Sequence, residues 1–320
     1  MPGSPPADPR FAAARDALDS GDGTGFAALL AADPTLVAAR DGHGNDLLAI
    51  AVATGSEDAV ARLLAAGADP DAANVHGWTA LHQAGYGGQT ALVERLLAAG
   101  ARPDREARGA GGTPLVQALF WGHREAAERL AAAIVVPANL RVAAGLGDLA
   151  RLERLVGPDG ALAPVAGAAR EFHRPHSGFP AWRPSDDPAE IRDEALAWAA
   201  RNGRDGAIEA LVARGARVDA DVHRGTALAW AAANGHAATI AMLVRLGADP
   251  DGRSTFGGPE HGEGVVPLHL AAQYGHGDAI AALLDAGADP TLRDRLHDTT
   301  PRAWAAHGPR PAVAEGLLPA

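Results

Sequence analysis

The chain has 320 residues with no cysteine and no lysine, which excludes disulfides, cysteine-ligated metal sites and every mechanism that needs a lysine amine. Its 39 acidic and 28 basic side chains leave a net charge of −11, so we expect neither nucleic acid nor an anionic membrane as a partner. The N-terminal MPGSPPADPR lacks a signal-peptide core and no run reaches membrane-spanning length, which predicts a soluble cytoplasmic protein.

The chain repeats itself. Residues 79–101, TALHQAGYGGQTALVERLLAAGA, align without a gap with residues 226–248, TALAWAAANGHAATIAMLVRLGA. Both segments carry a threonine, a leucine two residues later, a glycine nine residues after the threonine and a closing Gly-Ala. Self-similarity of this kind is the signature of a tandem structural array.

In chain order, each segment predicts two helices. The first helix begins after a capping threonine (Thr79, Thr113, Thr226), because a hydroxyl there accepts a free backbone N–H. It ends at a glycine suited to the left-handed conformation: Gly88, Gly122, Gly203, Gly235 and Gly275. The second helix carries paired apolar residues and ends at Gly-Ala-Asp-Pro closures, at 67–70, 247–250 and 287–290. A polar tip then leads to the next segment.

Helix, glycine turn, helix and hairpin-like tip, with a period of about 33 residues, resembles the ankyrin repeat. The resemblance rests on TALH at 79–82, PLHLAA at 267–272 and the Gly-Ala-Asp-Pro closures. It implies an all-α ankyrin-repeat solenoid: a non-enzymatic scaffold that binds another protein and needs no cofactor. The heavy use of Ala, Gly, Pro and Arg favours a bacterial source with a GC-rich genome.

The predicted array is a single one that spans residues 1–320. Units lie near 44–76, 77–110, 111–136, 138–156, 192–222, 224–252, 265–297 and 298–318. Residues 8–43 form an N-terminal capping unit, and 298–318 a C-terminal one, since an end unit faces water on one side. Two segments do not fit the repeat and are interpreted as loop insertions, 157–187 and 253–264.

Ten of the 13 histidines have a regular position in the repeat. For His82 and His269, the resemblance implies a structural hydrogen bond to a neighbouring tip. The others follow the glycine turn, lie at a tip or end the last first helix: His123, His236, His276, His43, His76, His223, His297 and His307. Only His173, His176 and His261 fall outside the frame, and all three lie in the insertions.

The aromatic residues fall at two kinds of position. Trp198, Trp230 and Trp304 share one place, four residues after the cap, and packing between repeats is favoured there over a ladder for ligand stacking. Positions seven and eight after the cap face the concave groove in ankyrin proteins, and large aromatics there are typical of binding hot spots. The predicted partner-binding residues are Trp78, Tyr86, Phe120, Trp121, Tyr274 and Phe256, with His76, His223 and Arg224 at the tips. The alternative is that the insertions cover them.

The insertion REFHRPHSGFPAWRPSDD (170–187) raises a second hypothesis. His173, His176 and His261, with Glu260, Glu263 or His223, would form a metal site of a hydrolase or metal sensor, since one intervening tip separates the insertions. Against it, the proline between His173 and His176 prevents helical alignment of the rings, and no HExxH, nucleophile elbow or phosphate loop is present. Asp187-Pro188-Ala189-Glu190 is interpreted as a helix cap with a capping-box glutamate.

Overall fold

The computed structural model describes residues 9–171, 183–222, 224–256 and 264–318. In these ranges the chain forms helices and no strand, which confirms the all-α prediction. Pairing of β type is limited to isolated bridges, such as Ala73 with Thr79 and Ser254 with Val265. These bridges close the polar tips, as the hairpin-like interpretation expects.

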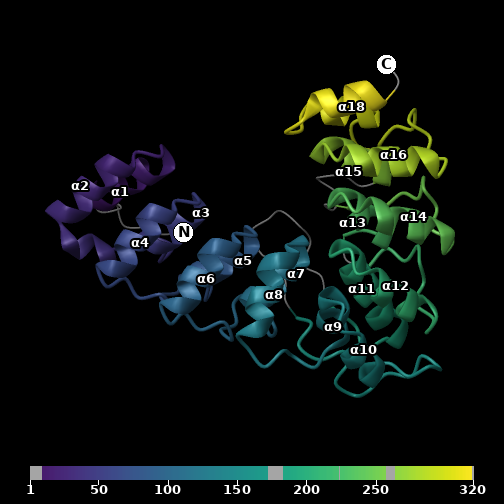
Figure 1. The fold of residues 1–320 in the computed structure, drawn as a ribbon, viewed down its shortest axis with the longest axis horizontal. Coiled ribbons are helices and arrows are strands. Elements are labelled where there is room, and N and C mark those ends of the chain that lie inside the picture. Colours follow the sequence, from purple (N-terminus) through teal and green to yellow (C-terminus); the bar gives the residue numbers. More distant parts are fainter. Residues whose placement is uncertain (1–8, 172–182, 223, 257–263, 319–320) are drawn as a thin grey trace. The chain divides into compact units, whose positions relative to one another are not determined.

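The chain divides into two compact units, residues 1–135 and 136–320 (Figure 1). The first unit contains α1 (Pro9–Asp19), α2 (Gly23–Ala32), the short 3₁₀ helix η1 (Pro34–Ala38), α3 (Leu47–Ala53), α4 (Glu57–Ala65), α5 (Ala80–Tyr86), α6 (Thr90–Ala98), α7 (Pro114–Trp121) and α8 (Arg124–Ala132). First helices pack on first helices, since α5 contacts both α3 and α7, while α6 packs on α8.

The second unit follows the same scheme. Its helices are α9 (Leu140–Leu146), α10 (Leu149–Leu155), α11 (Pro188–Arg201), α12 (Asp205–Val212), α13 (Ala227–Ala233), α14 (Ala237–Arg245), α15 (Pro267–Tyr274), α16 (Gly277–Asp285), α17 (Pro301–Ala305) and α18 (Pro311–Leu317). The first helices α9, α11, α13 and α15 pack in that order (Figure 1), and α17 packs on α15. The single array over 1–320 and the capping roles of 8–43 and 298–318 stay predictions.

The ends of the first helices match their sequence signals. The hydroxyls of Thr79, Thr113 and Thr226 accept the backbone N–H three residues later at 3.4, 3.4 and 3.1 Å. The five glycines predicted at the turns all have φ between 60° and 78°. A side chain is unfavourable in that left-handed region, so glycine at these turns follows from backbone geometry.

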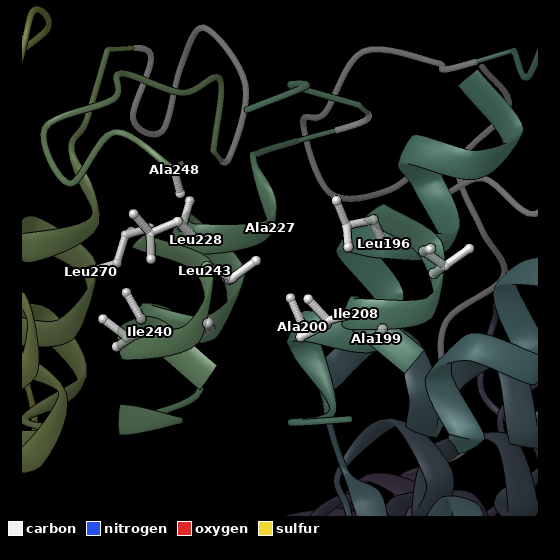
Figure 2. Close-up of a cluster of buried hydrophobic side chains, with 14 of the residues drawn as sticks. Leu196, Ala199, Ala200, Ile208, Ala227, Leu228, Ile240, Leu243, Ala248 and Leu270 are labelled. Atoms are coloured by element: carbon white, nitrogen blue, oxygen red, sulfur yellow. The ribbon is translucent and has the colours of Figure 1, made fainter. Parts of the chain in front are cut away.

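Small residues let the first helices pack closely. A Cβ at Gly85 of α5 would lie 2.6 Å from the carbonyl oxygen of Pro114 in α7, so only glycine allows this approach. In the second unit, a buried cluster joins Leu228 of α13, Leu243 of α14 and Leu270 of α15 (Figure 2). Burying such side chains supplies most of the stability of a helical repeat, because short helices are marginal alone.

Histidines connect consecutive repeats. The Nε2–H of His82 donates to the carbonyl of Gly112 at 3.1 Å, and that of His269 to the carbonyl of Thr299 at 2.9 Å. The hydrogen bonds expected between these two histidines and the neighbouring tips are therefore confirmed. His123, His236 and His276, after the glycine turns, donate to carbonyls in the preceding repeat at 2.9–3.1 Å.

Aspartates connect consecutive tips through the backbone. In each case, the carboxylate of one tip accepts the main-chain N–H of a later tip. The pairs are Asp71 with Arg102 at 2.8 Å, Asp219 with Asp249 at 3.1 Å, and Asp251 with Asp289 at 2.9 Å. The donor in each pair is a main-chain N–H, so these hydrogen bonds do not depend on the side chain of the donor residue.

The connection from α10 to α11 contains no helix in its described parts, 157–171 and 183–187. Asp187 caps α11 by accepting the N–H of Ala189 at 2.9 Å, and Pro188 is the first helical residue, as expected. The capping-box role of Glu190 is wrong: its carboxylate accepts the N–H of Ser185 and a guanidinium N–H of Arg170, both at 2.8 Å. A buried arginine from the connection is the stronger partner for this carboxylate.

Candidate partner-binding surface

An aromatic pair lies where two first helices of the first unit end. Tyr86, the last residue of α5, and Trp121, the last of α7, meet edge to face with ring centroids 5.3 Å apart and an interplanar angle of 82°. Both side chains are half-buried. The contact fixes their orientation while part of each ring stays accessible, which suits a rigid anchor for a partner.

Trp78 supports this pair from the tip. Its ring lies 6.2 Å from that of Tyr86, its indole N–H donates to Gln83 Oε1 at 3.2 Å, and the guanidinium of Arg108 stands 4.5 Å from its ring centroid. With 7% of its surface exposed, Trp78 is a buried support, contrary to its predicted place on an open surface.

The prediction of an exposed Phe120 is also wrong, since its side chain is 1% exposed. Consecutive residues on an α-helix point about 100° apart, so Phe120 and Trp121 cannot both face the groove. Phe120 packs edge-on against Trp121, with centroids 5.3 Å apart, and holds it from the core side.

Among the described residues of the second unit, Tyr274, the last residue of α15, has an aromatic side chain that is 40% exposed. Phe256 is half-buried and lies against Trp230, with ring centroids 4.7 Å apart. Partial burial raises the pKa of the Tyr274 hydroxyl, and the positive charge of Arg224 opposes that rise.

The tip residues differ from one another. His76 is half-buried, and its backbone N–H donates to Asn74 Oδ1 at 2.9 Å. Arg224 is 8% exposed and has a left-handed backbone with φ of 79°, so it is buried rather than displayed as predicted. His223 lies outside the described residues.

The tryptophans of the first helices α11, α13 and α17 are largely packing residues. Trp198 and Trp230 are buried, which confirms the packing interpretation for both. Guanidinium groups lie over both rings: Arg141 is 4.7 Å from the centroid of Trp198, and Arg201 is 3.5 Å from that of Trp230 and 5.9 Å from that of Trp198. Trp304 is partly buried, and its indole N–H donates to Asp294 Oδ2 at 3.0 Å.

A buried ion network in the second unit was missed by the sequence analysis. The carboxylate of Glu194 in α11 accepts from Arg141 at 2.9 Å and from Arg170 at 2.5 Å, and all three side chains are buried. Arg141 also donates to the carbonyl of Ala169 at 3.0 Å. The network ties the α10–α11 connection to α9 and α11, and no local pattern signals it because the partners lie 24 and 53 residues apart.

The metal hypothesis gains no support from the described part of the chain. There, no group of three or more histidine, aspartate or glutamate side chains is arranged to hold an ion. The residues proposed for that site, His173, His176, His261, Glu260, Glu263 and His223, lie outside the described residues.

Stacked helix pairs joined by hairpin-like tips define the class of the molecule as a helical repeat array. A family model described as "Ankyrin repeats (3 copies)" matches residues 21–139 and 142–254, and one described as "Ankyrin repeat" matches 263–295. The chain belongs to the ankyrin-repeat family. No curated protein matches it.

Among solved structures, the crystal structure of the human ASB11 ankyrin repeat domain aligns over 85% of this chain and 96% of its own. The identity is 22% and the TM-score 0.34, which say nothing of what this chain binds.

Proposed function

We propose that the protein binds another protein through the ends of its first helices, with the Tyr86–Trp121 pair as the main anchor. Ankyrin repeats are generally protein–protein interaction modules, typically without enzymatic activity. The observation that carries the proposal is the edge-to-face contact of these two half-buried rings. Aromatic anchors held in place by neighbours contribute most to binding, because little side-chain entropy is lost on association.

The protein acts as a binding module with no enzymatic activity and no cofactor, in the cytoplasm of a bacterium. Among the residues that the structure describes, no helix is long and apolar enough to cross a bilayer. Tyr274 extends the same kind of contact to the second unit, where it is the exposed aromatic at the end of α15.

Affinity capture from the native cell lysate tests the proposal. Wild type is compared with a Tyr86→Ala/Trp121→Ala variant, and with a Leu149→Ala control that removes an exposed apolar side chain from the second helix α10. We expect a protein that wild type and the control retain and the double variant loses.

Circular dichroism must show that the double variant is still folded. Equal retention by all three proteins would contradict the proposal and favour a role as a structural spacer, or binding through another surface. Capture by none of them would remove its support and direct the search to the insertions.

A further inference from the structure

The tip between α6 and α7 is closed by its own hydrogen bonds. The N–H of Ala107 donates to the carbonyl of Gly112 at 3.0 Å, and the N–H of Gly111 donates to Glu106 Oε1 at 2.8 Å. Ala107 is 3% exposed, so this part of the tip is packed down on the array. Arg108 follows directly, with a left-handed φ of 60°, and its side chain therefore starts from a fixed place.

This tip lies against the preceding one, next to Trp78. A Cβ at Gly77 would lie 3.2 Å from the carbonyl oxygen of Glu106 and 3.5 Å from Cα of Ala107, so the two tips are in direct contact. The guanidinium of Arg108 lies 4.5 Å from the ring centroid of Trp78. Because Arg108 is half-buried and Trp78 is buried, Arg108 is the more accessible of the two and covers part of the indole.

Arg108 is one end of a continuous row of side chains that leads to the proposed anchor. The Trp78 ring lies 6.2 Å from that of Tyr86, which in turn lies 5.3 Å from that of Trp121. One end of the row thus carries a positive charge, and the other end consists of two half-buried rings. Because an extended chain advances about 3.3 Å per residue, roughly three residues of a partner segment span the distance from Arg108 to Tyr86.

The charge beside the anchor is positive, although the chain as a whole carries a net charge of −11. Burial lowers the pKa of His82, which packs against Trp78, and the charges of Arg105 and Arg108 add to this shift. Aromatic rings by themselves attract a cation, but a cation here would be repelled by Arg108. The local charge therefore favours an anionic group on the partner.

A guanidinium can cover an indole and bind an anion at the same time. Contact with an aromatic ring uses the face of this planar group, whereas its N–H donors lie in its plane. A carboxylate meets two of these donors through parallel hydrogen bonds, and such charge-assisted bonds are stronger than those to a neutral amide. Carboxylate is therefore the partner group that suits Arg108 best.

We propose that Arg108 is a specificity-determining residue of the binding surface, and that the partner presents a carboxylate to it within about three residues of an apolar side chain on Tyr86 and Trp121. The partner segment is thus acidic and apolar. The inference rests on the proposed function and adds the chemistry of the partner. A purely structural role for Arg108, as a cover for Trp78, predicts no preference for acidic segments.

Selection from a library of random short peptides displayed on phage, with the full chain as bait, tests the inference. We expect the enriched peptides to carry Asp or Glu close to an aromatic or aliphatic residue. Tyr86→Ala/Trp121→Ala should abolish this enrichment. Arg108→Gln should keep the preference for the apolar residue and lose the preference for the acidic one.

The most enriched peptide, labelled with fluorescein, is then measured by fluorescence anisotropy. Replacing its acidic residue with the corresponding amide should raise the Kd for wild type about tenfold. The same replacement should change the Kd for Arg108→Gln less than about twofold, because the group that reads the charge is gone.

Arg102→Gln is the matched control, since it removes the same charge from the same tip. Arg102 is exposed and pairs with Asp104 at 3.1 Å. This variant should select the same peptides as wild type and bind the labelled peptide with the same Kd.

The inference would be overturned if wild type enriched no peptide or only peptides without acidic residues. Equal binding of the acidic and amide peptides to wild type, or the same loss on amidation in Arg108→Gln, would also overturn it. An unfolded Arg108→Gln variant, seen by circular dichroism, would assign Arg108 to the fold instead. The proposed function fails separately, if the Tyr86→Ala/Trp121→Ala variant retains the protein that wild type captures from the lysate.

Discussion

The imidazole of His82 is held in one tautomer by two backbone groups. Its Nδ1 accepts the N–H of Thr79 at 3.2 Å, so the proton must lie on Nε2, which donates to the carbonyl of Gly112. Burial lowers the pKa of His82 from 6.5 to about 4, although the bond to Gly112 opposes the shift. The folded protein therefore requires the neutral ring.

We expect acid to weaken the fold through this residue. The pKa of His82 is about 4 in the folded chain and 6.5 in the unfolded reference state. The stability that the neutral ring contributes to the fold is therefore fully present above pH 6.5 and is lost as the pH falls toward 4. The loss is about 3 kcal/mol of unfolding free energy.

Urea unfolding of wild type and His82→Asn at about pH 7.5 and about pH 4.5 measures the effect. The difference in unfolding free energy between the two pH values should be smaller in the variant, since its asparagine does not titrate. An equal difference in both proteins would mean that other groups cause the acid sensitivity.

Phe120 and Trp121 are neighbours with different roles. Phe120→Ala should lower the unfolding free energy by about 3–5 kcal/mol, because it leaves a cavity in a buried site. Trp121→Ala should cost about 1 kcal/mol and act mainly on binding.

Chemical denaturation followed by circular dichroism distinguishes the two variants of this pair. Similar losses of stability would show that Trp121 is as much a core residue as Phe120, and the proposed anchor would be reduced to Tyr86.

Among the helices, the distance between α5 and α7 depends on Gly85. Its Cβ would lie 2.6 Å from the Pro114 carbonyl oxygen and 3.4 Å from a methyl group of Leu130, so Gly85→Ala forces α5 away from α7. We expect a loss of about 1–3 kcal/mol in unfolding free energy, although alanine favours helices by about 1 kcal/mol over glycine.

Gly23→Ala, at the start of α2, is the control for the same measurement, because a Cβ there meets nothing within 4 Å. It should leave Tm unchanged or slightly higher. If Gly85→Ala behaved in the same way, the close approach of α5 and α7 would not limit the choice of residue.

Helices and turns could be predicted from the sequence wherever a few consecutive residues determine their ends. Caps at Thr79 and left-handed turns at Gly88 depend on a few consecutive residues, and both follow their signals. The predicted capping-box role of Glu190 is wrong because a competing partner, Arg170, lies 20 residues away in the sequence. The predicted exposure of Phe120 is wrong because its burial depends on how α7 packs, whereas the repeat pattern gives only its position along the helix.

The candidate site was less predictable than the fold for the same reason. Tyr86 and Trp121 stand at the predicted places, but their contact joins two repeats. The arginine cluster around Glu194 depends on partners up to 53 residues apart.

At the scale of the whole molecule, the absence of cysteine excludes thiolate ligands from any metal site. We expect protein purified without an affinity tag to contain no stoichiometric metal, as measured by inductively coupled plasma mass spectrometry. Bound metal that is lost in both His173→Ala and His261→Ala would instead favour the hydrolase or metal-sensor hypothesis.

The bonds between tips also bear on how such a chain can change over time. Asp71, Asp219 and Asp251 each hold a backbone N–H of a later tip, and every residue except proline supplies that group. When a repeat is duplicated or deleted, such an aspartate can therefore accept the backbone N–H of whichever tip then follows. No compensating substitution is needed in the neighbouring repeat. The number of repeats can evolve independently of the residues on the first helices that select what is bound.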